Sequence, residues 1–170
     1  MDLYQTIKKR YSCRSYSSKQ IEQEKLERIL EAARLAPSAK NLQDWRFVIV
    51  TDEEKRKQVA IAANEQIFIA TAPAIIVGCS NCDQTMRCGQ KISSIDAAIA
   101  MEHIALAATA EGLATCWIGS FYPEKVRKVL DIPEQIEIIE LMPIGYPADK
   151  ETHKPRENIE KIVCYEKWHF

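Results

Sequence analysis

The chain has 170 residues, which suffices for one domain with its own hydrophobic core, so we expect residues 1–170 to form a single domain. Hydrophobic residues make up 46% of the sequence and charged residues 28%, and the formal net charge is -1 at pH 7. This balance argues against disorder and against a general attraction to nucleic acid or anionic membrane. A site for an anionic ligand therefore has to be a local cluster of cationic side chains.

No segment of the sequence predicts a membrane span or an export signal. The longest apolar stretch, residues 95–110, is interrupted by Asp96, Glu102 and His103 and falls short of the roughly 18 apolar residues that a span needs. The N-terminus lacks a basic segment followed by an apolar one. Six cysteines without such a signal predict free thiols in the cytoplasm.

Helical and strand patterns alternate in the first half of the chain. Apolar residues recur at helical spacing in several segments, and runs rich in β-branched residues predict buried strands. In chain order, the elements are helices over residues 2–10 and 22–35, a strand over 47–50, a helix from 51 towards 63 and a strand over 74–78. Thr51, with Glu54 three residues later, matches a capping box and predicts the start of the third helix.

Residues 94–111 predict a helix that is apolar nearly all round and rich in alanine. Such a helix must be buried on all sides, and one layer of a small domain rarely covers a whole helix. We therefore expect a second copy of the chain to cover part of it. Gly112 is suited to end the helix in the left-handed conformation.

The last third of the chain predicts a strand, a helix that starts at a proline, a longer strand and a polar tail. These elements cover residues 115–118, 123–130 and 136–144, followed by a loop over 148–158 and a terminal strand or arm over 159–165. Strands that alternate with helices predict an α+β domain in which one sheet lies between two layers of helices, a three-layer α/β/α sandwich.

A basic segment follows the first predicted helix. In an extended segment alternate side chains face the same way, so Arg10, Ser12 and Arg14 would present two guanidinium groups and a hydroxyl to one point. Guanidinium donors match the oxygens of a phosphate, which makes this segment a candidate phosphate site. The alternative is a solvated basic stretch.

Three later segments offer further groups to a ligand. Residues 36–45 carry small and amide side chains between a helix and a strand, and Gly119 permits close backbone approach at a strand end. Residues 153–156 form a second basic cluster. Taken singly, these segments can equally be an ordinary turn, a strand-to-helix turn and a charged surface loop.

Together the segments resemble the nitroreductase family of FMN flavoproteins over essentially the whole chain. The motifs that carry the resemblance are, in order, R-x-S-x-R, APSAKNLQDW, SSIDAAIAMEHIALAATAEGL, TCWIG and PIGYP before HKP. The resemblance implies an α+β fold with a central mixed sheet in an intertwined homodimer, with FMN at the interface.

The resemblance also implies the cofactor-binding residues. The early basic segment meets the FMN phosphate and ribityl chain, the second segment reaches the flavin from the partner subunit, and the Trp-Ile-Gly loop lies along the isoalloxazine ring, its backbone amides near N5 and O4. The residues so implied are Arg10, Tyr11, Ser12, Arg14, Pro37, Ser38, Ala39, Asn41, Gln43, Trp117, Ile118, Gly119, Ser120, His153 and Lys154.

Two positions depart from the family pattern. Asp44 stands where the family usually has a proline before the tryptophan. His153 and Lys154 stand where a late arginine commonly meets the phosphate, so protonated His153, Lys154 and Arg156 all remain candidates for that contact.

The activity that the resemblance implies depends on the cofactor, and we expect no catalytic side chain. NADH or NADPH passes a hydride to flavin N5, and a nitroaromatic, quinone or related small acceptor is then reduced in a ping-pong cycle. The sequence leaves the acceptor open, because family relatives remove halogen or fragment the flavin, and it leaves open a protein electron donor. A flavin- or metal-binding redox sensor with little turnover is the alternative from another class.

Cys79, Cys82 and Cys88 have no role in the flavin interpretation. A Cys-x2-Cys pair with a further cysteine can ligate zinc or an iron–sulfur cluster, but the chain has no second such pair. We therefore predict no metal. In the ordinary interpretation Cys79 is a small buried hydrophobe at a strand end, and the other two lie in a reduced loop.

Overall fold

A four-stranded sheet forms the middle of the fold, in a computed structural model that describes residues 2–170. The strands are β1 (Trp45–Val50), β2 (Ala74–Ser80), β3 (Ala114–Thr115) and β4 (Glu137–Gly145), in the order β1-β2-β4-β3. All pairs among these strands are antiparallel. The resemblance implies a mixed sheet, with both parallel and antiparallel pairs. Within residues 2–170 the parallel pairing is a single isolated bridge, between Ser12 and Thr115.

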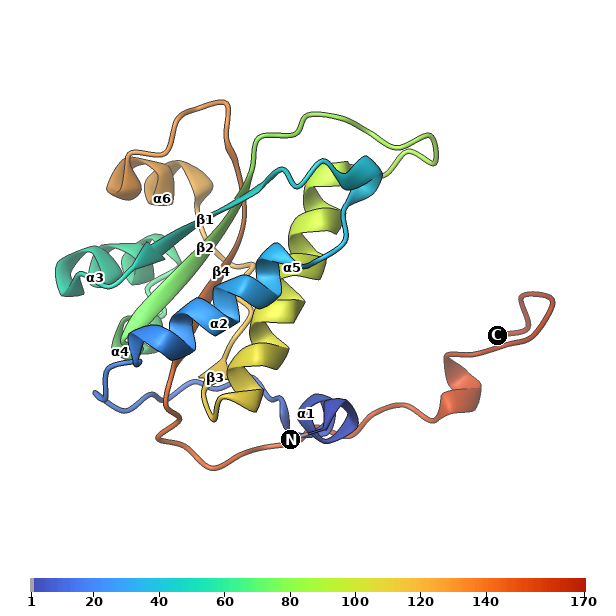
Figure 1. The fold of residues 1–170 in the computed structure, drawn as a ribbon, viewed down its shortest axis with the longest axis horizontal. Helices are drawn as coiled ribbons and strands as arrows, with labels where there is room; N and C mark the ends of the chain where they lie inside the picture. The colour runs from blue at the N-terminus through green and yellow to red at the C-terminus, as the bar shows by residue number, and fades with distance from the viewer. Residues whose placement is uncertain (1) are drawn as a thin grey trace.

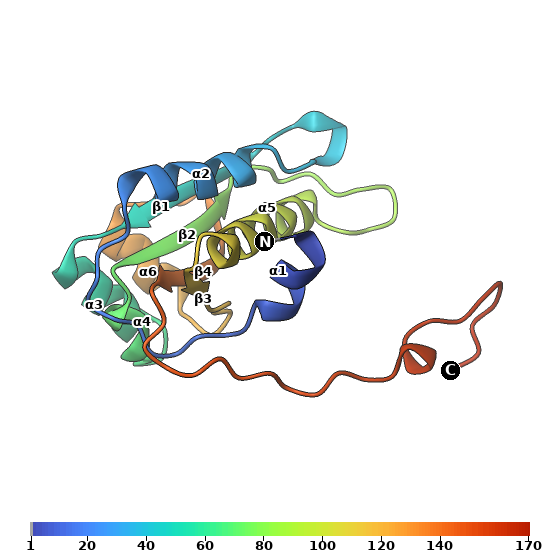
Figure 2. The same cartoon turned by 60° about the horizontal axis from the view of Figure 1, so that its bottom comes forward.

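Helices cover both faces of this sheet, which confirms the three-layer architecture (Figure 1). One face carries α2 (Gln23–Arg34) and α5 (Ile92–Ala110), and the other carries α3 (Glu53–Ala62), α4 (Phe68–Thr71) and α6 (Pro123–Leu130). The short helix α1 (Leu3–Lys9) lies against α5, as Figure 2 shows. Single turns of 3₁₀ helix occur at Ala39–Asn41 and Ile159–Lys161.

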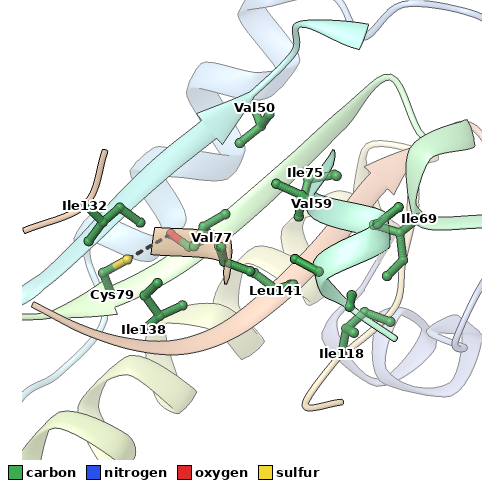
Figure 3. Packing of buried hydrophobic residues seen from close by; sticks show 14 of the residues in the cluster. Val50, Val59, Ile69, Ile75, Val77, Cys79, Ile118, Ile132, Ile138 and Leu141 are labelled. Atoms are coloured by element: carbon green, nitrogen blue, oxygen red, sulfur yellow. Dashed lines mark hydrogen bonds between the residues drawn. The ribbon is translucent and has the colours of Figure 1, made fainter. Parts of the chain in front are cut away.

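The alternating side chains of β2 build a separate core on each face. Ile75 and Val77 pack towards α3 and α6 with Val59 and Leu141, as Figure 3 shows. Ile76 packs on the opposite face, in the core that α2 and α5 cover. The buried strand predicted over residues 74–78 is confirmed, and all seven residues of β2 are buried. The expectation of a fully buried β1 is wrong, because β1 is an edge strand and its middle residues are only half-buried.

Helix α5 is a core helix, with Met101, Ile104 and Ala105 fully buried against the sheet and α2. By length and hydropathy alone α5 could cross a membrane, but here it packs inside the fold. The single chain leaves part of this helix uncovered, since Ile95 stays 37% exposed, and its cover by a second copy stays a prediction. Gly112 follows the helix with φ 78°, as predicted.

The remaining differences lie towards the C-terminus. The strand expected over 115–118 is shorter, because only Ala114 and Thr115 form a ladder and Ile118 meets Leu141 in an isolated bridge. The terminal segment is an arm rather than a strand, and it extends away from the rest of the chain (Figures 1 and 2). Its exposed apolar side chains are Ile159, Ile162, Val163, Tyr165, Trp168 and Phe170.

The start of α3 differs from the predicted capping box by one residue. Asp52 is the N-cap, and its Oδ1 accepts a hydrogen bond from the Lys55 amide at 2.9 Å. Asp competes well with Thr for this role because its negative charge also interacts favourably with the helix N-terminus. The prediction that Thr51 caps the helix is therefore wrong.

We expect Asp52→Ala to lower the free energy of unfolding by about 1 kcal/mol, since the amide at the start of α3 loses its acceptor. Thr51→Ala is the matched control and should change stability far less. Urea denaturation of both variants measures the difference. If Thr51→Ala lowers the free energy of unfolding more than Asp52→Ala does, Thr51 caps the helix, as the capping-box pattern predicts.

Candidate functional site

Two basic segments from opposite ends of the chain meet in one pocket. The early segment contributes outward-facing residues next to α1, and the late segment contributes its own basic residues from the loop after β4. The pocket has a volume of about 110 Å³ and is lined by Arg10, Tyr11, Ser12, Arg14, Thr152, His153, Lys154 and Arg156. A chain with almost no net charge thus concentrates cationic donors at one point.

The early segment has the alternation that the sequence predicts. Tyr11 and Cys13 point inwards and are buried, whereas Ser12 and Arg14 are exposed. The segment is attached to the sheet, since the Cys13 amide donates to the Thr115 carbonyl at 3.0 Å and Ser12 bridges to the same strand. The side chains that face the pocket are therefore held in place by backbone contacts.

Asp149, which the sequence analysis did not single out, fixes the shape of this segment. Its Oδ1 accepts from the Tyr11 hydroxyl at 2.7 Å and from the Cys13 thiol at 3.3 Å, and its Oδ2 accepts from the Arg14 amide at 3.2 Å. Burial acts to raise the pKa of Asp149, but these three donors hold the pKa below its ordinary value. An aspartate in a polar loop carries no sequence signal for this role.

The late basic residues differ in their partners. His153 pairs with Glu151 through its Nε2 atom, whereas Lys154 and Arg156 form no ion pair among residues 2–170. Lys154 and Arg156 thus keep their charges available to the pocket. Among the late basic residues, they are the better placed to meet an anion.

The turn over residues 36–45 lies outside this pocket. It sits beside the N-terminal end of α5, while α1 lies near the other end (Figure 1). The turn contacts α5 at Asp96 through the Ala39 amide, whereas Arg10 of the basic segment pairs with Glu102 further along the helix. The implied residues Pro37, Ser38, Ala39, Asn41 and Gln43 are thus not brought to the basic pocket of their own chain.

The turn is held by side-chain contacts. The Ala39 amide donates to Oδ2 of the buried Asp96 on α5 at 2.9 Å, and the Gln43 amide donates to Ser38 Oγ at 3.0 Å. Asn41 and Gln43 have positive φ values of 56° and 51°. The turn therefore has a defined and partly strained backbone.

Asp44, which departs from the family pattern, is built into the strand pair behind this turn. It is 7% exposed, and Ser80 on β2 donates a hydrogen bond to its Oδ2. A buried polar contact thus stands at this position.

The segment after β3 joins the basic segment to the sheet centre. Trp117 packs on the core under α5, and the Ile118 amide donates to the Leu141 carbonyl at 2.9 Å. The Ser120 hydroxyl accepts from Asn64 at 2.7 Å, so this side chain is occupied within the chain. Gly119 lies next to the Glu140 carboxyl group: a Cβ on Gly119 would lie 3.8 Å from Glu140 Oε2.

The cysteines do not form a metal centre in the described residues. All six are free thiols, and no three His, Cys, Asp or Glu side chains of residues 2–170 gather around a common point. Cys79 is buried in the core on the α3 side, and burial raises its pKa to about 11. Cys82 is half-buried and Cys88 is exposed.

Comparison with known proteins assigns the chain to a family. Residues 7–81 and 61–146 match the model of the nitroreductase family. The chain belongs to this family. Over 83% of both chains it is 37% identical to a protein of Archaeoglobus fulgidus named as an NADH dehydrogenase or NAD(P)H nitroreductase.

Solved structures of the family have the same fold. A nitroreductase family protein of Clostridium difficile matches 99% of this chain and 100% of its own with a TM-score of 0.90 and 34% identity. The NADPH:FMN oxidoreductase of Vibrio harveyi, solved with NAD+, matches 99% of this chain and 78% of its own with a TM-score of 0.90 and 26% identity. The implied nitroreductase fold is confirmed.

We expect Asp149→Ala to lower the free energy of unfolding by about 1–3 kcal/mol, because the Tyr11 hydroxyl and the Arg14 amide lose their acceptor. The folded-state pKa of Asp149 is below its unfolded value, so this stabilisation is present above the unfolded pKa and is lost as the pH falls through the folded one. Urea denaturation at pH 7 and at about pH 3 measures both effects.

Lys150→Ala, a change of the neighbouring exposed residue, is the control. A loss of stability equal to that of Lys150→Ala, or a loss that does not shrink in acid, would contradict the role of Asp149.

Proposed function

We propose that this protein is an NAD(P)H-dependent FMN oxidoreductase that reduces nitroaromatic, quinone or related small acceptors. The observation that carries the proposal is the pocket in which Arg10, Arg14, Lys154 and Arg156 gather beside the Ser12 hydroxyl. The relative named NADPH:FMN oxidoreductase and the NAD(P)H nitroreductase relative support it.

The donor set of this pocket fits a phosphate monoester. Guanidinium groups bind phosphate oxygens bidentately, and lysine and hydroxyl donors complete such a site. Arg10 and Arg14 would hold the phosphate from one side, and Lys154 or Arg156 from the other. His153 is the weaker candidate, since Glu151 already pairs with it.

The other residues would position the ring system of FMN. Gly119 and its neighbours would bring backbone amides against one edge of the ring, since glycine permits a close approach. The side chains of Ser38 and Asn41 would reach the ring from the partner subunit. Bound FMN supplies the two-electron chemistry, by accepting a hydride from NADH or NADPH and passing the electrons to the acceptor.

We further propose that the chain acts as one domain of residues 1–170 in a homodimer with a shared site. In one chain the turn at Ser38 contributes no residue to the basic pocket, so a second copy would be needed to bring such a turn to it. The exposed apolar residues of the C-terminal arm, such as Trp168 at 80% exposure, offer a surface that a partner would cover. Six free thiols suit a reducing compartment such as the cytoplasm.

The purified protein should carry flavin absorbance that NADH or NADPH bleaches rapidly under anaerobic conditions and that a quinone restores. Stepwise anaerobic titration with each nucleotide measures the stoichiometry and the preference. Bound flavin that neither nucleotide reduces would contradict an enzyme and support a redox sensor. Absence of flavin after reconstitution with FMN would contradict the proposal itself.

Arg10→Ala and Arg14→Ala should each weaken FMN binding about 10- to 100-fold, the effect of losing one charge-assisted hydrogen bond of about 1.5–3 kcal/mol. Fluorescence titration of the FMN-free protein gives the dissociation constants. Lys55→Ala, which removes one positive charge from the outer face of α3, is the control and should bind FMN like the parent. If both arginine variants bind FMN as tightly as the parent, this pocket does not hold the FMN phosphate.

A further inference from the structure

Glu140 is a carboxyl-bearing residue inside the sheet that the proposed function does not use. It lies on β4 opposite Gly78 on β2, and paired residues of antiparallel strands point to the same face. A Cβ on Gly78 would lie 3.1 Å from the sulfur of Met101, so this is the face that α5 covers. Glu140 Oε1 is shielded from solvent and has no hydrogen-bond partner among the described residues.

The carboxyl group lies next to the Gly119 turn. Its Oε2 atom is 3.8 Å from the position of a Cβ on Gly119. Burial raises the pKa of the Cys116 thiol, the charges of Arg14 and Arg10 lower it, and the charge of Glu140 raises it. The two guanidinium groups and the carboxylate therefore act on the same thiol from nearby.

Burial of this carboxyl group outweighs the donors around it. Burial raises the pKa of Glu140 to about 7, although the backbone amides of Ile118 and Leu141 act to lower it. From the segment after β3 the titratable group that faces it is the Cys116 thiol. Gly78 on β2 and Met101 on α5 contribute no charge on this face. The group can therefore gain or lose a proton near neutral pH.

We propose that Glu140 couples reduction of the flavin to the uptake of one proton from solvent. This inference rests on the proposed function, which puts the flavin ring against Gly119. A hydride from NAD(P)H carries two electrons and one proton, releases NAD(P)+ and adds one negative charge to the cofactor. Oε1 of Glu140 then binds a solvent proton, which neutralises the carboxylate beside that new charge.

The test is the pH dependence of the flavin reduction potential in the parent and in Glu140→Gln. Each proton bound per two electrons changes the potential by about 30 mV per pH unit. From about pH 7 upwards the slope of the parent should be about twice that of Glu140→Gln, because Glu140 binds a second proton. Glu137→Gln, whose carboxyl group is already paired with Lys91 and Ser93, should keep the parent slope.

Proton uptake by the parent provides a second measurement that needs no variant. NADH is added to the flavin-bound protein in weak buffer at about pH 7.5. An indicator dye should then report that a proton is taken up from solvent, in addition to the hydride that NADH delivers. Equal slopes in parent and Glu140→Gln, or no uptake by the parent, would overturn the role of Glu140 while leaving the flavin enzyme intact. A parent that binds no FMN would overturn the proposed function as well, so the two failures are distinguishable.

Discussion

The carboxylate of Asp149 holds together the part of the molecule on which the proposed chemistry depends. By accepting from Tyr11, Cys13 and Arg14, it draws the loop after β4 against the basic segment after α1. Two cationic segments would otherwise repel each other. One half-buried acceptor that bonds the backbone and the inward-facing side chains leaves the side chains of Arg10 and Arg14 to line the pocket.

Helix α5 sets the distances in the site. Its inner residues are buried under the sheet and α2, while different positions along it contact the two binding segments. Asp96 near the first end holds the Ala39 amide, and Glu102 further along lies 3.8 Å from Arg10. The helix thus holds the turn at a position where it does not line the pocket of its own chain, which is the arrangement that a shared site in a dimer requires.

Charge is unevenly placed around the sheet centre. The arginines lie on the solvent side of the basic segment, and Glu140 lies on the α5 side of β4 with one oxygen unpaired. A carboxylate oxygen that is shielded from solvent and has no partner is costly unless the group is protonated. The fold therefore keeps a group that titrates near neutral pH next to the turn where the flavin ring is proposed to lie.

Periodicity in the sequence sufficed for most of the elements, since β2, α5 and α6 depend on local patterns of apolar residues, alanine and proline that tertiary packing reinforces. The motifs sufficed to predict the family, and the spacing of Arg10, Ser12 and Arg14 sufficed to predict that their side chains face the same way. Only the tertiary structure decided the edge position of β1 and the roles of Asp149 and Glu140. These depend on which residues distant in the chain become neighbours and on how much water is excluded between them, and neither quantity is encoded in local spacing.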